Sequence, residues 1–548
     1  MPDAKNDSTR LEVKQALMRH SRRHMRAQMV PQVSAKEVVS WIPDGATLAI
    51  LGAGGGLNEA TTIIDALAER AAAEGSPCGL TIVHSSGLGD RATRGMSPLA
   101  IAGLAKRVIG GHWGQSPTLA EMASRNEFEA YNFPQGVMSQ LYRAAAAGHP
   151  GILTHVGLQT FVDPRSRGGK LNEVTQEDLI KLMEIEGKEY LFYPTVPVDF
   201  AIVRATTADA LGYLSMEDEI AFLDTLALAQ ATHNNGGIVV AQVQRVVKAR
   251  SLHPKSVKVP GFLVDAIVVE PEQPQLYFGT INRSFSGDYQ VETQEPELLP
   301  LDIRKVVARR ALLEIKPGDV GNVGVGISDG VGVVAQEEGI HEDFTLTVEL
   351  GPIGGTSIQG IFLGAGVNTQ AVLDMPAQFD FYDGGGLDVA LLSFAEVDQA
   401  GNVNVHAFGG KLMGTGGFIN IAQNTKKVIF SGTLTAGGLE VAVSPEAIRV
   451  KREGRFTKFV AEMPEVTFSA ALARAEGHEV IYITERAVFT LTDQGVTLTE
   501  IAPGVDIERD VIAHMGFRPA LGGEVKVMDQ RLFTDGIMNI AAWWRNRD

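Results

Sequence analysis

One glutamate stands where a predicted strand ends beside a glycine-rich loop, a place from which a carboxylate can reach a ligand. Residues 344–351 read FTLTVELG, and Glu349 is followed by a loop that contains three glycines. Ligands of open α/β sheets bind beyond the carboxyl ends of the strands, so Glu349 could attack or deprotonate a bulky substrate there. The alternative is an exposed strand-end glutamate that forms a surface ion pair.

Two other glycine clusters could lie against a ligand. Residues 52–57 read GAGGGL, but a dinucleotide-binding loop needs glycine at Leu57 and an acidic residue about twenty positions further on. A Rossmann dehydrogenase is therefore a weak alternative, whereas a loop that cradles a nucleotide-like anion stays plausible. Three consecutive glycines at residues 384–386, just before the predicted strand 387–392, indicate close approach by a ligand or by another backbone.

Metal and thiol chemistry find little support in the sequence. His20 and His24 have the i, i+4 spacing of a metal pair, but two arginines lie between them and no acidic ligand is near. The single cysteine, Cys78, can form neither an intramolecular disulfide nor a thiolate metal site. His84 and Ser85 look like a base and a nucleophile, but neighbours on a strand point to opposite faces. We therefore expect no metal.

The elements that must position these residues recur in two halves of the chain. Residues 42–52 can be laid without a gap on residues 316–326, and residues 80–87 on residues 344–351. Residues 198–216 match residues 387–405, with identical residues at the pairs Asp199/Asp388, Ala201/Ala390, Asp209/Asp398 and Gly212/Gly401. Such self-similarity indicates two homologous domains. Because Asp388 has a counterpart, we interpret it as structural.

Strand and helix patterns alternate in both halves. Apolar strands such as residues 237–243 alternate with helical patterns at residues 60–73 and 302–315. Strands that are apolar throughout are typical of a mostly parallel sheet covered on both faces. We predict an α/β fold with two homologous, open, mostly parallel-sheet domains in tandem. The expected parts are an N-terminal extension at residues 1–35, a first domain at 36–290, a linker at 291–301 and a second domain at 302–548.

Function is best sought where the two halves differ in chemistry. Ser85 in the first half aligns with Glu349 in the second. Shared folding explains the positions that agree, so this difference favours a functional role for Glu349. The changing offset of the alignment also places insertions of about ten and about 75 residues in the first half, where repeat proteins carry surface additions.

Composition excludes several classes of partner. The chain has 48 Lys and Arg residues against 65 Asp and Glu residues, a formal net charge of −17. This sign opposes nucleic-acid phosphates and anionic lipids, so neither nucleic acid nor a membrane is an expected partner. Apolar runs are too short for a membrane span and the N-terminus is polar, so we expect no secretory signal and predict a cytoplasmic protein.

Longer motifs make the family recognisable. They are KRVIGGHWG at residues 106–114, EAYNFPQGV at 129–137, THVGLQTFVDPR at 154–165, VELGPIGG at 348–355, QFDFYDGGGLD at 378–388 and GTGGFINI at 414–421. With these motifs the sequence resembles the family I CoA-transferases of the fused two-domain type, in the acetate/propionate (acyl-CoA:acetate/3-ketoacid) CoA-transferase subgroup. The resemblance implies two copies of the CoA-transferase (NagB/RpiA-like) fold.

The resemblance also implies roles for individual residues. Glu349 is similar to the family's catalytic glutamate, which forms a γ-glutamyl-CoA thioester, and Gln135 to the residue whose amide polarises the thioester carbonyl. Val325 and Gly326 resemble the loop that lies against the reacting carbonyl. Further roles are implied for two glycine loops: backbone donors near the carbonyl for Gly384, Gly385 and Gly386, and CoA binding for Gly414, Gly416, Gly417 and Phe418.

The implied reaction is the exchange of CoA between a short-chain acyl-CoA and a free carboxylate such as acetate or propionate, by a ping-pong mechanism. Coenzyme A is then a substrate, no cofactor is held permanently, and a homo-oligomer, namely a tetramer, is implied. Leu350 leaves the acyl preference open, because close relatives usually carry a small polar residue there.

Two alternatives from other classes stay open. An acyl-CoA hydrolase on the same scaffold would use Glu349 as a general base on water. A non-catalytic ligand-binding protein with a sugar-phosphate-like fold would need no carboxylate at this position, so Glu349, Gln135 and the glycine loops argue against it.

Overall fold

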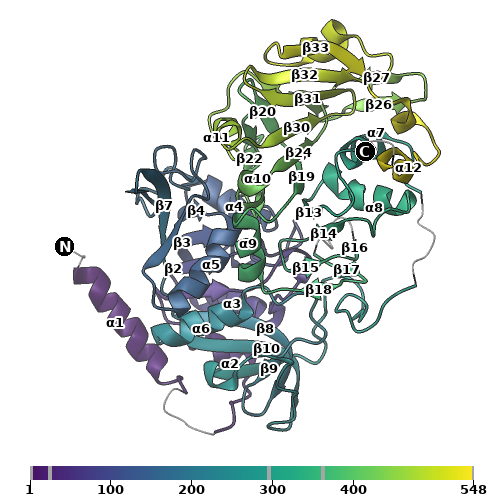
Figure 1. The fold of residues 1–548 in the computed structure, drawn as a ribbon. Helices are drawn as coiled ribbons and strands as arrows, with labels where there is room; N and C mark the ends of the chain where they lie inside the picture. Colours follow the sequence, from purple (N-terminus) through teal and green to yellow (C-terminus); the bar gives the residue numbers. More distant parts are fainter. Residues whose placement is uncertain (1–3, 23–27, 293–297, 359–363, 546–548) are drawn as a thin grey trace.

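The structure, a computed structural model, describes residues 4–22, 28–292, 298–358 and 364–545. Its described residues contain two large sheets, and the half of the chain that carries the second sheet stands above the first half in Figure 1. The N-terminal helix α1 (Ala4–Met18) packs Val13 and Leu17 against the outside of the first half. Every described helix is too short or too polar to cross a membrane.

Parallel strands build the core of the first sheet, and helices cover both of its faces. Leu48 and Ala49 of β1 point into different hydrophobic cores, one shared with α2, α3 and α4 and the other with α5 and α6. The helices are α2 (Ala35–Val39), α3 (Thr61–Glu74), α4 (Pro117–Ser124), α5 (Gln135–Ala146) and α6 (Thr225–Asn235). The parallel strands, in spatial order, are β12 (Ala266–Val269), β10 (Ile238–Val247), β8 (Phe200–Asp209), β1 (Thr47–Ile50), β2 (Leu80–His84), β3 (Ala105–Gly110) and β4 (Glu129–Asn132).

The second sheet has a parallel centre, and the strands added at both sides pair antiparallel except for the last strand of the chain, which runs parallel to its neighbour. The parallel strands, in spatial order, are β30 (Glu479–Ile483), β24 (Lys427–Ser431), β19 (Val389–Ser393), β13 (Val320–Val323) and β14 (Thr345–Thr347). Strands added at the edges are β15 (Pro352–Ile353) and β18 (Ala371–Val372) on one side, and β31 (Ala487–Thr492), β32 (Gly495–Ile501) and β33 (Ala520–Val527) on the other. Its helices are α7 (Ile303–Leu312), α8 (Gly330–Glu337), α9 (Met375–Asp383), α10 (Phe418–Asn424), α11 (Ala470–Ala475) and α12 (Ile540–Trp544).

Short strands complete both halves outside the parallel cores. The first half adds β9 (Leu214–Ser215) and β11 (Val257–Val259) to its main sheet, and β5 (Gly151–Thr154), β6 (Lys181–Ile185) and β7 (Lys188–Pro194) form a separate sheet. The second half adds small sheets made from the pairs β16 (Thr356–Ser357) with β17 (Gly366–Val367), β22 (Ala407–Phe408) with β23 (Lys411–Leu412), β25 (Thr435–Ala436) with β28 (Phe456–Thr457), and β26 (Glu440–Val443) with β27 (Ile448–Arg452), and from the trio β20 (Glu396–Asp398), β21 (Val403–Asn404) and β29 (Phe459–Val460).

The predicted fold class is confirmed, because the two parallel cores have the same strand order. The order β12-β10-β8-β1-β2 in the first half corresponds to β30-β24-β19-β13-β14 in the second. Asp199 accepts a hydrogen bond from the backbone N–H of Thr47 at 3.0 Å, and Asp388 accepts one from that of Val320 at 3.0 Å. The matched aspartates therefore do the same structural work, which is to tie two neighbouring strands together at their starts.

This shared bond also corrects one detail of the sequence alignment. Thr47 and Val320 occupy the same capped position, so the gap-free pairing of residues 42–52 with 316–326 is out of register by one residue. The pairing of residues 80–87 with 344–351 is in register, because Thr81 pairs with Thr47 and Thr345 with Val320. The domain limits stay predictions, and the predicted linker at 291–301, like the extension at 1–35, lies partly outside the described residues.

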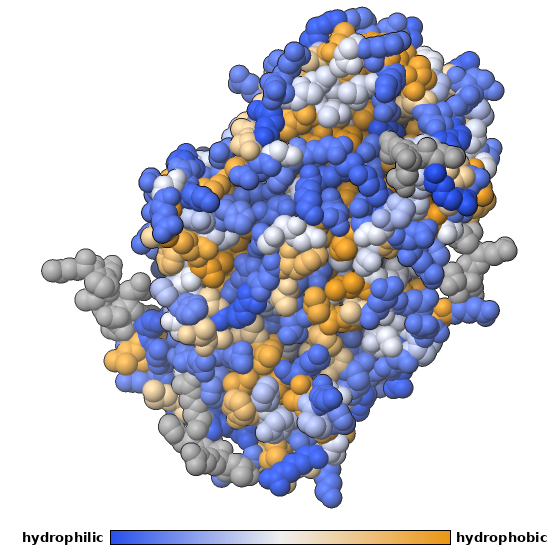
Figure 2. Space-filling view, in the orientation of Figure 1, coloured by the Kyte–Doolittle hydropathy of each residue, from blue (hydrophilic) through white to orange (hydrophobic). Residues whose placement is uncertain are grey.

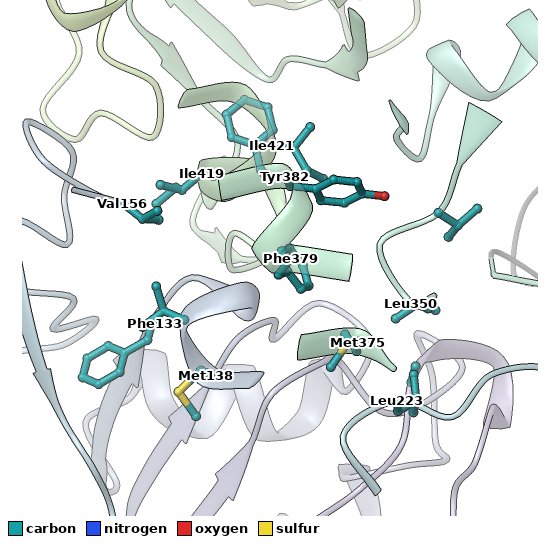
Figure 3. Close-up of a cluster of buried hydrophobic side chains, with 14 of the residues drawn as sticks. Phe133, Met138, Val156, Leu223, Leu350, Met375, Phe379, Tyr382, Ile419 and Ile421 are labelled. Atoms are coloured by element: carbon teal, nitrogen blue, oxygen red, sulfur yellow. The ribbon is translucent and has the colours of Figure 1, made fainter. Parts of the chain in front are cut away.

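A continuous hydrophobic core joins the two halves. Figure 3 shows Phe379 on α9 between Met138, from the first half, and Ile419, from the second. At the edge of this seam Arg143 on α5 forms two hydrogen bonds of 2.6 Å to the carboxylate of Asp380 on α9. The outer surface is mostly hydrophilic on the face shown in Figure 2, with hydrophobic patches near its middle.

Candidate active site

A cleft of about 520 Å³ lies between the two halves, at the carboxyl ends of strands from both sheets. Gln135 from the first half and Glu349 from the second both line it. A larger groove near Tyr213 and Phe262 contains none of the predicted site residues. The other lining residues include Ala53, Gly54, Ser86, Gly87, Arg91, His112 and Gln115 from the first half, and Asn322, Gly324, Val325, Leu350, Ser393, Phe394, Phe408, Lys411, Met413, Gly414, Thr415, Gly416, Gly417 and Phe418 from the second.

Glu349 follows β14 and presents a half-buried carboxylate to the cleft. Burial raises the pKa of this carboxyl above its ordinary value, and hydrogen bonds from its own backbone N–H and from the Asn322 amide only partly offset the effect. A carboxylate that is poorly solvated in this way is a better nucleophile than one in water.

A buried hydrogen-bond network lies next to Glu349 and fixes the strand end that carries it. The hydroxyl of Tyr382 accepts hydrogen bonds from the side-chain amides of Gln378 at 2.7 Å and Asn322 at 3.3 Å. Its own proton is then free to go to the hydroxyl of Thr347 at 2.7 Å, and Thr347 donates in turn to the carbonyl of Gly321 at 2.9 Å. These hydrogen bonds all run in one direction, from Tyr382 on α9 through Thr347 to Gly321 on β13.

Gln135 is the first residue of α5, and main-chain contacts with the second half hold it in place. Its backbone N–H donates to the carbonyl of Gly416 at 2.9 Å, and the next N–H, of Gly136, donates to the side chain of Asn420 at 3.1 Å. A side chain at Gly136 would meet the ring of Phe379 at 2.4 Å, so only glycine allows this close approach. The Gln135 amide contacts the sulfur of Met375 at 3.3 Å, a weak acceptor that a substrate oxygen can replace.

Further main-chain bonds connect the loop after β3 with the loop before α10. The N–H groups of Trp113 and Gly114 both donate to the carbonyl of Met413 at 2.8 Å. In the opposite direction the N–H of Gly416 donates to the carbonyl of Gly111 at 2.8 Å. These contacts, which we call the seam bonds, place the predicted CoA-binding residues Gly414, Gly416, Gly417 and Phe418 on the wall of the cleft.

Val325 lies on the wall of the cleft as well, and Gly326 follows it with a left-handed φ of 110°. The carbonyl of Val325 accepts a hydrogen bond from the hydroxyl of Ser393 at 2.9 Å. A side chain at Gly326 would meet that same hydroxyl at 2.7 Å. The N–H groups of Val325 and Gly326 donate no hydrogen bond within the described part of the chain, so they are free for a ligand oxygen.

The glycine triplet at 384–386 does not lie in the cleft, which corrects the sequence-based expectation. Gly385 has a φ of 78°, its N–H donates to the carbonyl of Tyr382, and the N–H of Gly386 donates to that of Phe381. This is the Schellman pattern that ends an α-helix, here α9. Gly384, Gly385 and Gly386 therefore end a helix, and their amides are not available as donors to a reacting carbonyl.

The glycines at residues 52–57, by contrast, do reach the cleft, through Gly54. A side chain at Gly56 would meet the ring of Tyr277 at 2.6 Å, and one at Gly52 would meet Glu59 at 2.5 Å. Packing against this buried Glu59–Tyr277 pair explains two of the glycines. Leu350 is 3% exposed and also lines the cleft.

Sequence reasoning missed several polar residues of the cleft, including Asn322, His112, Gln115, Arg91 and Lys411. Once the register is corrected, Asn322 is equivalent to Ala49, and this polar-for-apolar difference on a central strand was a detectable signal. His112 was present in a family motif without an assigned role. Arg91 and Lys411 are exposed and form no ion pair with a described residue, so two free cations stand in the cleft wall.

Comparison with known proteins agrees with this geometry. Residues 32–270 match the family model for coenzyme A transferase. The acetate CoA-transferase YdiF of Escherichia coli K12 is 58% identical over 510 residues, which cover 93% of this chain and 96% of that protein. The caffeate CoA-transferase of Acetobacterium woodii is 41% identical over 92% of this chain and 98% of its own length.

Solved structures extend the similarity to three dimensions. The crystal structure of the acyl-CoA transferase YdiF apoenzyme from E. coli O157:H7 matches with a TM-score of 0.90 and 57% identity, over 93% of this chain and 97% of that one. A second structure of that protein, described as a thioester complex with CoA, matches with a TM-score of 0.90 and 56% identity.

Proposed function

The chain belongs to the coenzyme A transferase family, and from this premise we propose that Glu349 carries CoA between two carboxylic acids in the cleft described above. The enzyme is a CoA-transferase that moves CoA from an acyl-CoA to a free carboxylate through a thioester intermediate. The observation that supports Glu349 most strongly is its half-buried carboxylate, with its raised pKa, in one cleft with Gln135.

The first half-reaction divides one difficult exchange into two easier steps. The Glu349 carboxylate attacks the thioester carbonyl, the carbon–sulfur bond breaks, and CoA leaves as a thiolate with an acyl-glutamyl anhydride left behind. The thiolate then attacks the glutamyl carbonyl of the anhydride and releases the first acid as a carboxylate. Glu349 now holds CoA as a thioester, and the incoming carboxylate runs the same steps in reverse.

Each attack places negative charge on a carbonyl oxygen, and the cleft offers donors for it. Gln135 lines the cleft from the first half and Val325 from the second, and the candidate donors are the side-chain amide of Gln135 and the free N–H groups of Val325 and of the next residue, Gly326. Preorganised donors of this kind act strongly where water is excluded. Arg91 and Lys411 provide positive charge for the phosphates of CoA at the exposed parts of the wall.

The acids exchanged are short-chain carboxylates in this proposal, with acetate and propionate as the first to test. The relative at 58% identity is an acetate CoA-transferase and the one at 41% identity is a caffeate CoA-transferase, so the preferred acid differs within the family. Leu350, buried in the cleft wall, restricts the acyl group on one side. A homotetrameric assembly and a cytoplasmic location remain predictions.

Mass spectrometry tests the role of Glu349 directly. Enzyme incubated with propionyl-CoA and no acceptor should gain the mass of CoA, and peptide mapping should place it on Glu349. An adduct on another side chain, or normal exchange without any adduct, would contradict the proposal.

Steady-state kinetics separate transfer from hydrolysis. With acyl-CoA and a carboxylate as co-substrates, double-reciprocal plots should give parallel lines, because the first acid leaves before the second binds. The acyl-CoA hydrolase is the second candidate, since Glu349 could also activate water. A rate of CoA release that added acetate or propionate does not change would favour the hydrolase.

A further inference from the structure

His112 occupies a place in the cleft that the reaction described above does not use. It follows β3, and its neighbours in the chain are both held by the seam bonds, Gly111 through its carbonyl and Trp113 through its N–H. The imidazole lines the cleft together with Gln135 and Glu349. Its main chain is therefore fixed to both halves, and its ring has little freedom to move away.

The ring lies close to the Gln135 amide. A side chain at Gly416 would be 3.5 Å from Cδ2 of His112 and 3.5 Å from Oε1 of Gln135. The two side chains thus flank the same glycine, and the absence of a side chain at Gly416 leaves the space between them open to a ligand.

The two ring nitrogens of His112 have different surroundings. Nδ1 is buried without a hydrogen-bond partner and faces Gly87, whose side chain, if it had one, would meet this atom at 2.6 Å. Nε2 is not among the enclosed polar atoms and has no partner in the described residues, so it opens into the cleft. A buried N–H without an acceptor is rarer than a buried acceptor without a donor, which assigns the proton to Nε2.

The imidazole is also neutral. Burial, together with the positive charge of Arg91 and the neighbouring His84, lowers the pKa of His112 to about 4. His84 adds no charge of its own near neutral pH, because burial lowers its pKa to about 4 as well. A neutral imidazole presents one N–H and resists taking a second proton, so it polarises a carbonyl without activating water.

From this geometry we infer that His112 is a catalytic residue, whose Nε2–H donates a hydrogen bond to the carbonyl oxygen of the thioester beside Gln135. The inference rests on the proposed transferase function and extends it. It gives the first half of the molecule two donors to the carbonyl, from the loop after β3 and from the start of α5. It also explains why a histidine beside a reactive anhydride does not turn the enzyme into a hydrolase.

Two substitutions at this position separate donation from packing. His112→Ala removes the donor and should lower kcat on the order of 10²-fold, with KM changed by less than about threefold. His112→Gln keeps a neutral N–H near the place of Nε2 and should retain kcat within about tenfold of the native enzyme. His253→Ala, at an exposed histidine far along the chain, is the control that should change neither value.

Infrared spectroscopy reads the hydrogen bond itself. In the Glu349→Gln background, which cannot react, acyl-CoA labelled with ¹³C at the carbonyl should bind intact, and donors should lower its stretching frequency. Adding His112→Ala should move this band to higher frequency, whereas adding His112→Gln should leave it near its place. If His112 had only a structural role, replacing it would not move the band.

The outcomes are distinct. Unchanged turnover in His112→Ala, or lost turnover with an unmoved carbonyl band, would overturn the inference. If the native enzyme exchanges CoA and the His112→Ala variant gives either of these results, only the role of His112 is refuted. Native enzyme that exchanges no CoA between any acyl-CoA and acid refutes the proposed function, and this inference with it.

Discussion

At the ends of their second strands the two halves carry Ser85 and Glu349, and the surroundings of these residues differ more than their positions. Ser85 is 4% exposed, and its hydroxyl donates to Asp224, which also accepts from Ser139. Glu349 opens to the cleft and has few hydrogen-bond partners. The strand end of the first half is thus structural, because its polar groups form hydrogen bonds with one another. The equivalent strand end of the second half can take part in a reaction, because its acid remains accessible.

Both halves bury an acid near this strand end, and burial raises both pKa values. In the first half the pKa of Asp224 rises to about 6, even though two serine hydroxyls donate to it. In the second half the acid whose pKa is raised is Glu349 itself. A raised pKa alone therefore does not distinguish the carboxylate that we propose to be reactive from the structural one, whereas access to the cleft does.

The largest effect should come from Glu349→Gln, which removes the nucleophile and keeps the shape. We expect exchange to fall by at least about 10⁴-fold, with no CoA adduct and a native circular dichroism spectrum. An exchange assay with acetate and propionyl-CoA measures the loss. Substantial remaining exchange would contradict the contrast between Ser85 and Glu349, because the second half would then carry no acid that the reaction requires.

Gln135→Ala should have the next largest effect, because it removes one donor to the oxyanion. We expect kcat to fall by about 10²- to 10³-fold with little change in the thermal midpoint. Steady-state kinetics and a melting curve check both parts. Near-native turnover would mean that the backbone amides of the second half act alone.

Ser85→Ala tests the first half at the position equivalent to Glu349. We expect turnover within about threefold of native and a free energy of unfolding lower by about 1–2 kcal/mol, because Asp224 loses a hydrogen-bond donor. Urea unfolding and an exchange assay measure the two quantities. A large loss of turnover at unchanged stability would show that the first strand end takes part in the chemistry.

Asp383→Asn should have the smallest effect on turnover, and only stability should change. Burial at the seam raises the pKa of Asp383 from 3.8 to about 7, although Asn420 and Gln140 donate to it. The folded protein therefore keeps a proton that the unfolded chain has lost, and stability falls as the pH rises between these two values and stays lower above them. The substitution should raise the thermal midpoint more at pH 8 than at pH 5, and equal shifts at both would contradict the assignment.

The sequence predicted the parallel cores and Glu349 because these depend on local patterns and on the repeat. Apolar strands, matched aspartates and a carboxylate before a glycine loop are visible in a single chain, and the common strand order confirms the fold. The triplet at 384–386 shows the limit of this reasoning. Consecutive glycines signal unusual backbone geometry, but a helix end and a ligand loop require the same residue type, and only the location of α9 decides between them.

Residues that meet across the cleft were harder to find, because their function depends on distances between segments far apart in the chain. His112 and Gln135 both approach Gly416 from the opposite half. Nothing in the spacing of these residues along the sequence indicates that contact. The change from Ala49 to Asn322 was visible in principle, but an alignment error of one residue concealed it.

The seam bonds have a consequence for how such an enzyme diversifies. Trp113, Gly114 and Gly416 connect the two halves through main-chain groups, which every residue except proline supplies in the same form. The hydrogen bonds themselves therefore do not depend on the type of side chain, but the close approach of the loops does, because a side chain at Gly111 would meet the carbonyl oxygen of Ser85 at 1.8 Å. We therefore expect substitutions that adapt the cleft to other acids in its walls, and not at the glycines that bring the two main chains together.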